Sequence, residues 1–239
     1  MLEGAARSGR PQLLLASWPD PTVVLGYGQP VDDVDLEACR RLGMPVLRRL
    51  TGGTGVVHHG DLGVSLALPA PHPWADGIVG LYGRFLDVLA PALRAAGAPV
   101  ERLAVHVRAS RVRSPICFEE QLADTLVIGG RKVVGCAQVR RRGAVLVHAA
   151  VLCGLDPDRY AAVFRVEPER VRRALAPALD PSRRRAAGDL VVEGLAAALA
   201  GEPVEVGEPR PGPEHLAPYA TFRWQPLALE PQGRSATEE

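Results

Sequence analysis

One segment, residues 125–152, restricts the possible folds more than any other part of the chain. It reads TLVIGGRKVVGCAQVRRRGAVLVHAAVL, and its short apolar runs are separated by two turn signals. Gly129 and Gly130 suit a tight hairpin turn, and residues 141–143, Arg-Arg-Gly, suit a second tight loop. The segment therefore predicts three consecutive antiparallel strands, with Lys132 at the start of the middle strand.

The middle strand of this predicted meander has two distinct faces, because successive side chains of a strand point to opposite sides. One face carries Lys132, Val134, Cys136 and Gln138. The opposite face carries Val133, Gly135, Ala137 and Val139. The face of Lys132 has small and mostly uncharged side chains, which indicates that this face contacts a ligand.

Helical patterns surround the meander. From about Asp76 to Ala96, apolar residues recur at helical spacing, and Asp32 or Asp33 is placed to cap a short helix that ends at Gly43. Three further helical patterns follow from Asp156 onward. Strands that come first and helices that come afterwards predict an α+β domain rather than alternating βαβ units.

The length of the chain fits one domain with a tail. Its 239 residues are many for one average domain and few for two. We expect residues 1–226 to form a single domain. Residues 227–239 are polar and predict a loose C-terminal tail.

The composition argues against several classes of function. The chain is 47% hydrophobic and 23% charged, with a net charge of +1, which is ordinary for a globular protein and atypical of disordered chains and nucleic-acid binders. No apolar run reaches the length of a membrane span, and Leu13–Ala16 is too short for a secretion signal. We therefore expect a cytoplasmic protein without membrane or nucleic-acid partners.

The cysteines give no sign of a metal site. Cys39, Cys117, Cys136 and Cys153 stand far apart and form no C-x-x-C pair. This spacing indicates neither a zinc site nor a disulfide framework. We expect free thiols in a reducing compartment and no bound metal.

The basic residues are almost all arginine. Of the 28 lysines and arginines, Lys132 is the single lysine. An ammonium is a compact point charge with three rotatable donors, whereas a guanidinium is a broad planar fork. The presence of Lys132 in so arginine-rich a chain indicates that position 132 requires an ammonium. The alternative is chance retention of one surface lysine.

Three segments resemble the superfamily of lipoate-protein ligases and octanoyltransferases. RRLTGGTGVVHH, residues 48–59, is similar to the R-R-x-T-G-G-G-x-V-x-H loop of that superfamily. Residues 129–152 resemble its G-R-K-[IV]-x-G-[SN]-A-x-x-R segment, and VVLGYGQP, residues 23–30, resembles its early turn ending in Gln. The resemblance implies a biotin/lipoate protein ligase (BPL/LPL) catalytic domain over residues 1–226, an α+β fold with a mixed sheet and flanking helices.

The glycine-rich loop is the predicted centre of substrate binding. Consecutive glycines let backbone N–H groups approach an oxygen-rich reacting centre. The substrate-binding residues implied by the resemblance are Arg49, Thr51, Gly52, Gly53, Thr54, Gly55, Val56, Val57, His58, Gly135, Ala137 and His148. We expect His58, at the buried end of the loop, to give support rather than to transfer protons. The alternative for TGGTG is a plain turn.

Cys117 and Lys132 are the predicted catalytic residues. SPICFEEQ, around Cys117, resembles the Pro-x-Cys-Phe segment that carries the nucleophile of the cysteine-dependent octanoyltransferases. A thiolate accepts an acyl group from another thioester without ATP. The resemblance implies that the Lys132 ammonium offsets the charge that develops on the acyl carbonyl oxygen. Cys39 and Cys153 are expected to be small buried hydrophobes, which is also the alternative for Cys117.

Three positions depart from the pattern of the superfamily. Thr54 stands where the ligases have Gly and the octanoyltransferases often have a basic residue. Cys136 stands where Ser is common, and Ala149 follows His148 where Gly is common. The first departure bears on the choice between ligase and transferase, and the other two change the shape of the pocket.

The sequence favours an octanoyltransferase that moves an octanoyl or lipoyl group from a carrier-protein thioester, through Cys117, to the lysine of a lipoyl domain. The implied donor is acyl carrier protein, and the acceptors are lipoyl domains or the glycine cleavage H protein. Transfer needs no cofactor. A rival is an ATP-dependent lipoate-protein ligase, which would require ATP and Mg²⁺ and leave Cys117 incidental. Amidotransfer between lipoyl-bearing proteins and a non-catalytic acyl- or lipoate-binding protein are the remaining alternatives.

Replacement of the single lysine tests whether an ammonium is required. We expect Lys132→Arg to remove most transferase activity while the fold survives, because a planar guanidinium does not fit a site built for a compact ammonium. Octanoyl transfer to a lipoyl domain and the thermal unfolding midpoint measure the two effects. Near-normal turnover of Lys132→Arg would contradict the requirement.

Overall fold

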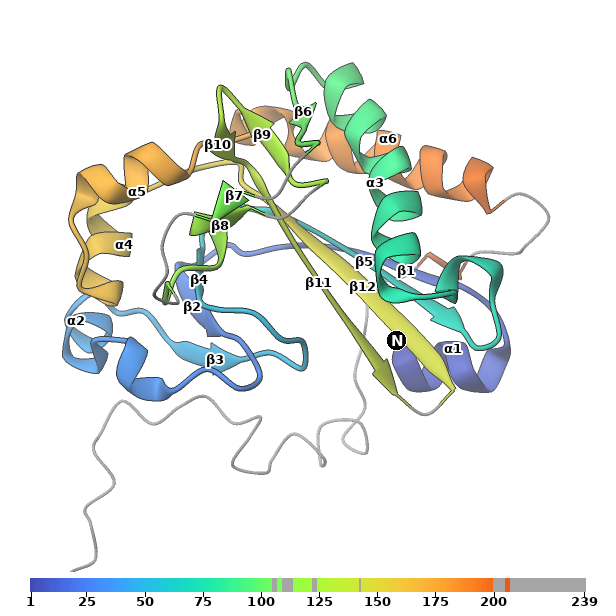
Figure 1. Ribbon diagram of the computed structural model, residues 1–239, viewed down its shortest axis with the longest axis horizontal. Coiled ribbons are helices and arrows are strands. Elements are labelled where there is room, and N and C mark those ends of the chain that lie inside the picture. The colour runs from blue at the N-terminus through green and yellow to red at the C-terminus, as the bar shows by residue number, and fades with distance from the viewer. Residues whose placement is uncertain (105–106, 109–113, 122–123, 142, 200–204, 207–239) are drawn as a thin grey trace, which may run out of the picture.

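The computed structural model describes residues 1–239 except 105–106, 109–113, 122–123, 142, 200–204 and 207–239. The predicted domain boundary at residue 226 and the tail 227–239 lie outside the described residues. The described part is a mixed α+β fold with several sheets (Figure 1), as the sequence predicted.

The largest sheet has five strands in the order β11-β12-β5-β1-β13. Its strands are β1 (Gln12–Ser17), β5 (Leu62–Pro69), β11 (Val134–Arg141), β12 (Ala144–Val151) and β13 (Glu205–Val206). Neighbouring strands are antiparallel, except that β1 and β13 are parallel. β11 forms one edge of this sheet, and the candidate site lies beside it.

The remaining strands form three smaller sheets. β2 (Thr22–Leu25) lies between β3 (Val46–Arg48), to which it is parallel, and β4 (Val56–His58), to which it is antiparallel. A second sheet has the order β10-β9-β6 and consists of β6 (Glu101–Arg102), β9 (Leu126–Ile128) and β10 (Arg131–Lys132). The third is the pair β7 (Val107–Arg108) and β8 (Glu120–Gln121), which lies between the β2 sheet and the five-stranded sheet in Figure 1.

The helices fall into two groups (Figure 1). α3 (Ile78–Ala95) and α6 (Arg184–Ala198) pack together over one face of the five-stranded sheet, and α1 (Leu2–Ser8) packs on the opposite face. α2 (Leu36–Arg41), α4 (Pro157–Phe164) and α5 (Pro168–Ala174) surround the β2 sheet. Four 3₁₀ turns complete the described elements: η1 (Val31–Asp33), η2 (Pro73–Ala75), η3 (Cys117–Glu119) and η4 (Pro181–Arg183).

Each group of helices covers its own hydrophobic core. The larger core joins α3 and α6 to the five-stranded sheet through residues such as Leu66, Phe85 and Val147. The smaller core joins the β2 sheet to α4 and α5 and includes Val23 and Tyr160. The candidate site lies where the two sheets with their helices meet. The residues of the site belong to the segments that connect these two parts of the fold.

The predicted helix at 76–96 is confirmed as α3, but the predicted cap of the preceding short helix is wrong. Asp32 and Asp33 belong to η1, and the cap of α2 is Asp35, whose carboxylate accepts a hydrogen bond of 2.9 Å from the Ala38 N–H. The backbone N–H of Asp35 donates to the Val163 carbonyl of α4. A tertiary contact therefore selects one aspartate among several possible caps.

The predicted continuous middle strand of the meander is also wrong. Lys132 ends β10, which pairs with β9, whereas β11 begins at Val134 and pairs with β12. Lys132 also forms a parallel bridge with Leu175. Val133 and Val134 are both buried in the larger core, so the alternation of faces breaks between them. The chain passes from one sheet to another at this point, because that course buries both valines.

Truncation of a core residue on α3 tests the packing of the larger core. Leu89 is 1% exposed, and we expect Leu89→Ala to lower the free energy of unfolding by about 2 to 5 kcal/mol. Val79→Ala, on the same helix at a residue that is 75% exposed, is the matched control and should change it by less than about 0.5 kcal/mol. Urea unfolding measures both values, and equal effects would contradict the packing described.

Candidate active site

The glycine loop, residues 51–55, is held by the side chain of Arg49. Its guanidinium donates to the Thr51 hydroxyl at 3.0 Å, to the Gly52 carbonyl at 2.8 Å and to the Thr54 carbonyl at 3.0 Å. These acceptors are spread along the loop. A single arginine side chain therefore fixes most of its course.

Arg48 holds the turn that follows β2. It donates to the Gly26 carbonyl at 2.7 Å and to the Gln29 carbonyl at 2.6 Å. Burial lowers the pKa of Arg48, although an arginine remains charged at physiological pH. A Cβ at Gly26 would collide with the Gly53 carbonyl oxygen, so glycine at this position allows the turn and the glycine loop to meet.

Cys117 is positioned by the end of the glycine loop. The Gly55 N–H donates to the Pro115 carbonyl at 2.8 Å, and the Cys117 N–H donates to the Gly55 carbonyl at 2.9 Å. The Lys132 ammonium donates to the Cys117 carbonyl at 3.2 Å. The buried Gln29 amide donates to the Pro115 carbonyl at 2.9 Å. The loop, the cysteine and the single lysine are thus brought together from distant parts of the sequence.

The turn that carries Cys117 is anchored by the buried carboxylate of Glu119. This carboxylate accepts hydrogen bonds from Arg170 of α5, from Nε at 2.5 Å and from Nη2 at 2.8 Å. It also accepts one from the Ser114 hydroxyl, whose oxygen in turn accepts from the Ile116 N–H at 3.0 Å. A buried charge is stable only when it is paired, so this arrangement fixes the turn.

His148 joins β12 to the glycine loop. Its Nε2 lies 2.8 Å from the Thr51 hydroxyl oxygen. Burial lowers the pKa of His148 to about 4, and the charges of Arg49 and His58 act in the same direction. His148 is therefore neutral at physiological pH and serves as a hydrogen-bond partner of the loop.

Small residues line the sheet face on which His148 lies. The strand register places Gly135, Ala150 and Gly63 side by side, and it places Ala137 beside His148. Residues paired across neighbouring strands point to the same face. Because His148 contacts Thr51 from this face, these small residues lie on the face of the sheet that is turned toward the glycine loop. Gly135 and Ala137 are two of the residues predicted to bind substrate.

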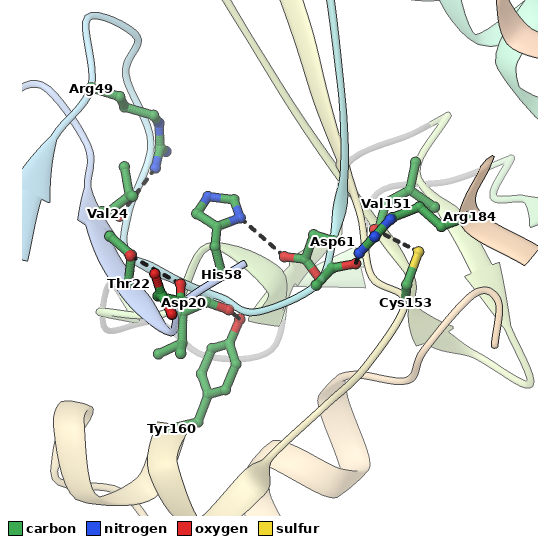
Figure 2. A network of polar contacts seen from close by, with 12 residues as sticks. Asp20, Thr22, Val24, Arg49, His58, Asp61, Val151, Cys153, Tyr160 and Arg184 are labelled. Carbon is green, nitrogen blue, oxygen red and sulfur yellow. Dashed lines mark hydrogen bonds and ion pairs between the residues drawn. The ribbon is translucent and has the colours of Figure 1, made fainter. Parts of the chain in front are cut away.

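His58 lies at the other end of β4 and makes different contacts. Its Nδ1 contacts Asp61 Oδ2 (Figure 2), at a distance of 3.0 Å. The Trp18 ring stacks on the His58 imidazole with 4.4 Å between ring centroids. Burial raises the pKa of Asp61, whose second oxygen is buried and has no hydrogen-bond partner within the described ranges. Next to His58, the Val57 carbonyl accepts a hydrogen bond of 3.1 Å from the Tyr160 hydroxyl (Figure 2). These contacts fix β4 and do not bring the His58 side chain to Cys117.

The other cysteines are poorly suited to nucleophilic chemistry. Cys39 and Cys153 are buried, as the sequence predicted, and burial raises the pKa of each thiol to about 11. Burial also raises the pKa of Cys136 to about 12, although the charge of Lys132 acts in the opposite direction. Cys117 is half-buried and hydrogen-bonded to the glycine loop, which distinguishes it from these three thiols.

Several residues of the site were not among those predicted. Gln29 and Arg48 belong to segments that resembled the superfamily, so the motifs contained a signal for them. Glu119 and Arg170 are 51 residues apart in the sequence and meet only in the fold, so no local pattern indicated their pairing.

The described residues offer neither a metal site nor a membrane-spanning helix. They contain no group of three or more His, Cys, Asp or Glu side chains placed to hold a metal ion. Among the same residues, no helix has the length and apolar character needed to cross a membrane.

Comparison with protein families identifies the class of this domain. Residues 1–186 match the family of lipoyl protein ligase A/B catalytic domains. The chain belongs to this family. The resemblance recognised in the three sequence segments is thereby confirmed.

The chain is also similar to relatives that are named octanoyltransferases. Octanoyltransferase LipM of Moorella thermoacetica is 36% identical over 179 residues, which cover 73% of this chain and 65% of that protein. The match thus spans less than two thirds of that relative's length. Octanoyltransferase LipM of Kyrpidia tusciae is 32% identical over 238 residues, which cover 90% of this chain and 86% of that protein.

Among solved structures, the fold is similar to a bi-partite lipoate protein ligase from Thermoplasma acidophilum. The TM-score is 0.68, with 22% identity, and the superposition covers 93% of this chain and 88% of that one. At this identity the similarity concerns the fold alone. It agrees with the predicted BPL/LPL type of mixed α+β domain.

The lowered pKa of His148 predicts a specific loss of stability in acid. In the unfolded chain a histidine takes up a proton near pH 6.5, whereas folded His148 does so near pH 4, so acidification between these values favours unfolding. We expect His148→Gln, which retains a partner for Thr51, to lack this effect. The difference in free energy of unfolding, wild type minus variant, should fall by on the order of 2 kcal/mol between pH 7 and pH 4.5. Urea unfolding at both pH values measures it, and a constant difference would exclude a buried neutral imidazole.

Proposed function

We propose that this chain is an octanoyltransferase that uses Cys117 as its nucleophile and Lys132 to stabilise the oxyanion. It takes an octanoyl or lipoyl group from the thioester of an acyl carrier protein. It then passes the group to a lysine of a lipoyl domain or of the glycine cleavage H protein. The relatives named octanoyltransferase LipM support this assignment.

The observation that carries the proposal is the contact set of Cys117. Its backbone N–H is bonded to the end of the glycine loop, and its carbonyl oxygen accepts from the Lys132 ammonium at 3.2 Å. The candidate nucleophile therefore lies beside both the group that offsets negative charge and the loop whose N–H groups suit an oxyanion. A cysteine without a chemical role would not require either neighbour.

The reaction consists of two acyl transfers. In the first, the Cys117 thiolate attacks the thioester carbon, the bond from that carbon to the carrier sulfur breaks, and the carrier leaves as a thiolate that takes up a proton. In the second, the amine of the acceptor lysine attacks the Cys117 thioester, an amide forms and the thiol of Cys117 is regenerated. Both steps pass through a tetrahedral oxyanion, which the Lys132 ammonium and the glycine loop stabilise.

The strip of small residues provides a place for the acyl chain. Gly135, Ala150 and Gly63 leave space on the sheet face opposite the glycine loop, and Ala137 continues it. Burial of a methylene group contributes about 0.8 kcal/mol, so an octanoyl chain gains enough free energy there to set a preference for chain length. Arg49, Thr51 and His148 hold the loop over this strip.

The same proposal includes the setting of the enzyme. We place the catalytic domain within residues 1–226 and the protein in the cytoplasm, where thiols stay reduced and acyl carrier proteins occur. Transfer between thioesters needs neither a cofactor nor a metal. ATP and Mg²⁺ enter only if the chain is a lipoate-protein ligase, the activity named for the Thermoplasma acidophilum structure of similar fold.

The two candidate activities differ in their need for ATP. A ligase activates a free acid as its adenylate and releases pyrophosphate, so it exchanges labelled pyrophosphate into ATP in the presence of lipoate. We expect no exchange above background. A non-catalytic binding protein would show neither exchange nor acyl transfer.

Intact mass measurement tests the role of Cys117. We expect wild-type protein incubated with octanoyl-loaded acyl carrier protein, without ATP, to gain one octanoyl group and to lose it to neutral hydroxylamine, because thioesters react with that nucleophile and amides do not. Addition of a lipoyl domain should discharge the adduct. Cys117→Ala should form no adduct.

The matched control for this experiment is Cys39→Ala, which removes a buried thiol on α2 and should leave the adduct unchanged. Full transfer by Cys117→Ala would exclude Cys117 as the nucleophile. If the lipoyl domain is modified only in the presence of ATP and free acid, the activity is that of a ligase and the transferase assignment is wrong.

A further inference from the structure

Gln138 has a buried acceptor that no group in the described part of the chain satisfies. It lies on β11, and its amide nitrogen donates to the Ile78 carbonyl at the start of α3 at 2.9 Å. Its Oε1 is shielded from solvent and has no hydrogen-bond partner among the residues that the structure describes. A buried acceptor without a donor costs about 1 to 3 kcal/mol, so such an atom calls for an explanation.

Tyr82 brings a donor to the same place. It lies one helical turn after Ile78 and on the same side of α3, and its hydroxyl interacts with the Gln138 side chain. Burial raises the pKa of Tyr82 to about 12, so its hydroxyl stays protonated at physiological pH.

This pair of polar groups lies next to the candidate nucleophile. The thiols of Cys136 and Cys117 and the guanidinium of Arg49 are close enough to the Tyr82 hydroxyl to influence its pKa, and Cys117 is close enough to Cys136 to influence the pKa of that thiol. η3, which begins with Cys117, packs beside β11. Gln138 follows Cys136 on the same face of β11, about 7 Å further along the strand. The polar pair therefore lies within reach of a thioester bound at Cys117.

We infer that Tyr82 and Gln138 form a subsite for an amide group of the thioester donor, the amide that follows the sulfur in a pantetheine-type arm. The amide N–H would donate to Gln138 Oε1, and its carbonyl would accept from the Tyr82 hydroxyl. The inference rests on the proposed function and specifies its donor. The unsatisfied acceptor of Gln138 and the hydroxyl donor of Tyr82 match the two polar groups of a secondary amide.

The chemistry of the arm favours this occupant over the acyl chain. The amide nitrogen of a pantetheine arm is two methylene groups from the sulfur, so it comes next to the reacting centre when the thioester reaches Cys117. An octanoyl chain carries no polar group beyond its carbonyl and leaves both groups unsatisfied. A water molecule satisfies both as well, but it gives no preference between donors.

Donors with and without the amide test the subsite. The probes are S-octanoyl-pantetheine and S-octanoyl-2-mercaptoethanol, and the readout is kcat/KM for acylation of Cys117, followed by intact mass. We expect wild-type protein to prefer the amide donor. Tyr82→Phe and Gln138→Met should each lower this preference about five- to tenfold, as loss of a neutral hydrogen bond predicts.

Arg140→Gln is the matched control. Arg140 lies two residues after Gln138 and donates to the Ala75 and Gly77 carbonyls just before α3, so the variant weakens the same anchorage of the helix without touching the subsite. Its preference between the two donors should equal that of wild type. A fall in preference with Arg140→Gln would assign the effect to the position of α3 and overturn the subsite.

The remaining outcomes separate the subsite from the proposed function. If Tyr82→Phe slows both donors by the same factor, Tyr82 has a structural role and the subsite is overturned while the transferase stands. If acylation is unchanged but discharge to a lipoyl domain slows, the amide belongs to the acceptor and the inference is wrong. If neither donor acylates wild-type Cys117, both proposals are overturned.

Discussion

The pairing of Gly55 with residues 115–117 is the interaction on which the rest of the site depends. Two backbone hydrogen bonds join the end of the glycine loop to the segment that carries Cys117. The approach requires glycine, because a Cβ at position 55 would overlap the Phe164 ring and crowd the Pro115 carbonyl. Cys117 lies beside Lys132 because this pairing fixes the course of the two segments that it joins.

Buried polar side chains then lock the pairing in place. Gln29 ties the turn after β2 to the Pro115 carbonyl, and Glu119 ties the turn after Cys117 to Arg170. Each of these buried groups has hydrogen-bond partners, so the desolvation cost of burying it is offset and its position is fixed. For the acyl transfer that we propose, a thiol held in this way needs little reorganisation before it attacks a thioester.

The cationic side chains of the site differ in what they bind. The cations Arg48 and Arg49 bind main-chain carbonyls and act as clamps of the loop, whereas the ammonium of Lys132 bonds to the carbonyl of the candidate nucleophile itself. His148 stays neutral because it is buried near Arg49. An ammonium beside the proposed nucleophile, with guanidinium groups that bind only the loop and the turn, agrees with the retention of one lysine in a chain otherwise rich in arginine.

The sequence by itself determined the class of the fold, the long helix α3, the buried state of Cys39 and Cys153, and the segments that meet at the site. These follow from local information, because hydrophobic period and glycine-rich motifs are written in neighbouring residues. Only the tertiary structure decided that Asp35 caps α2, that the middle strand divides at Val133 and that Glu119 pairs with Arg170. These features depend on contacts between residues far apart in the chain, where burial of both Val133 and Val134 outweighs the alternation of a single strand.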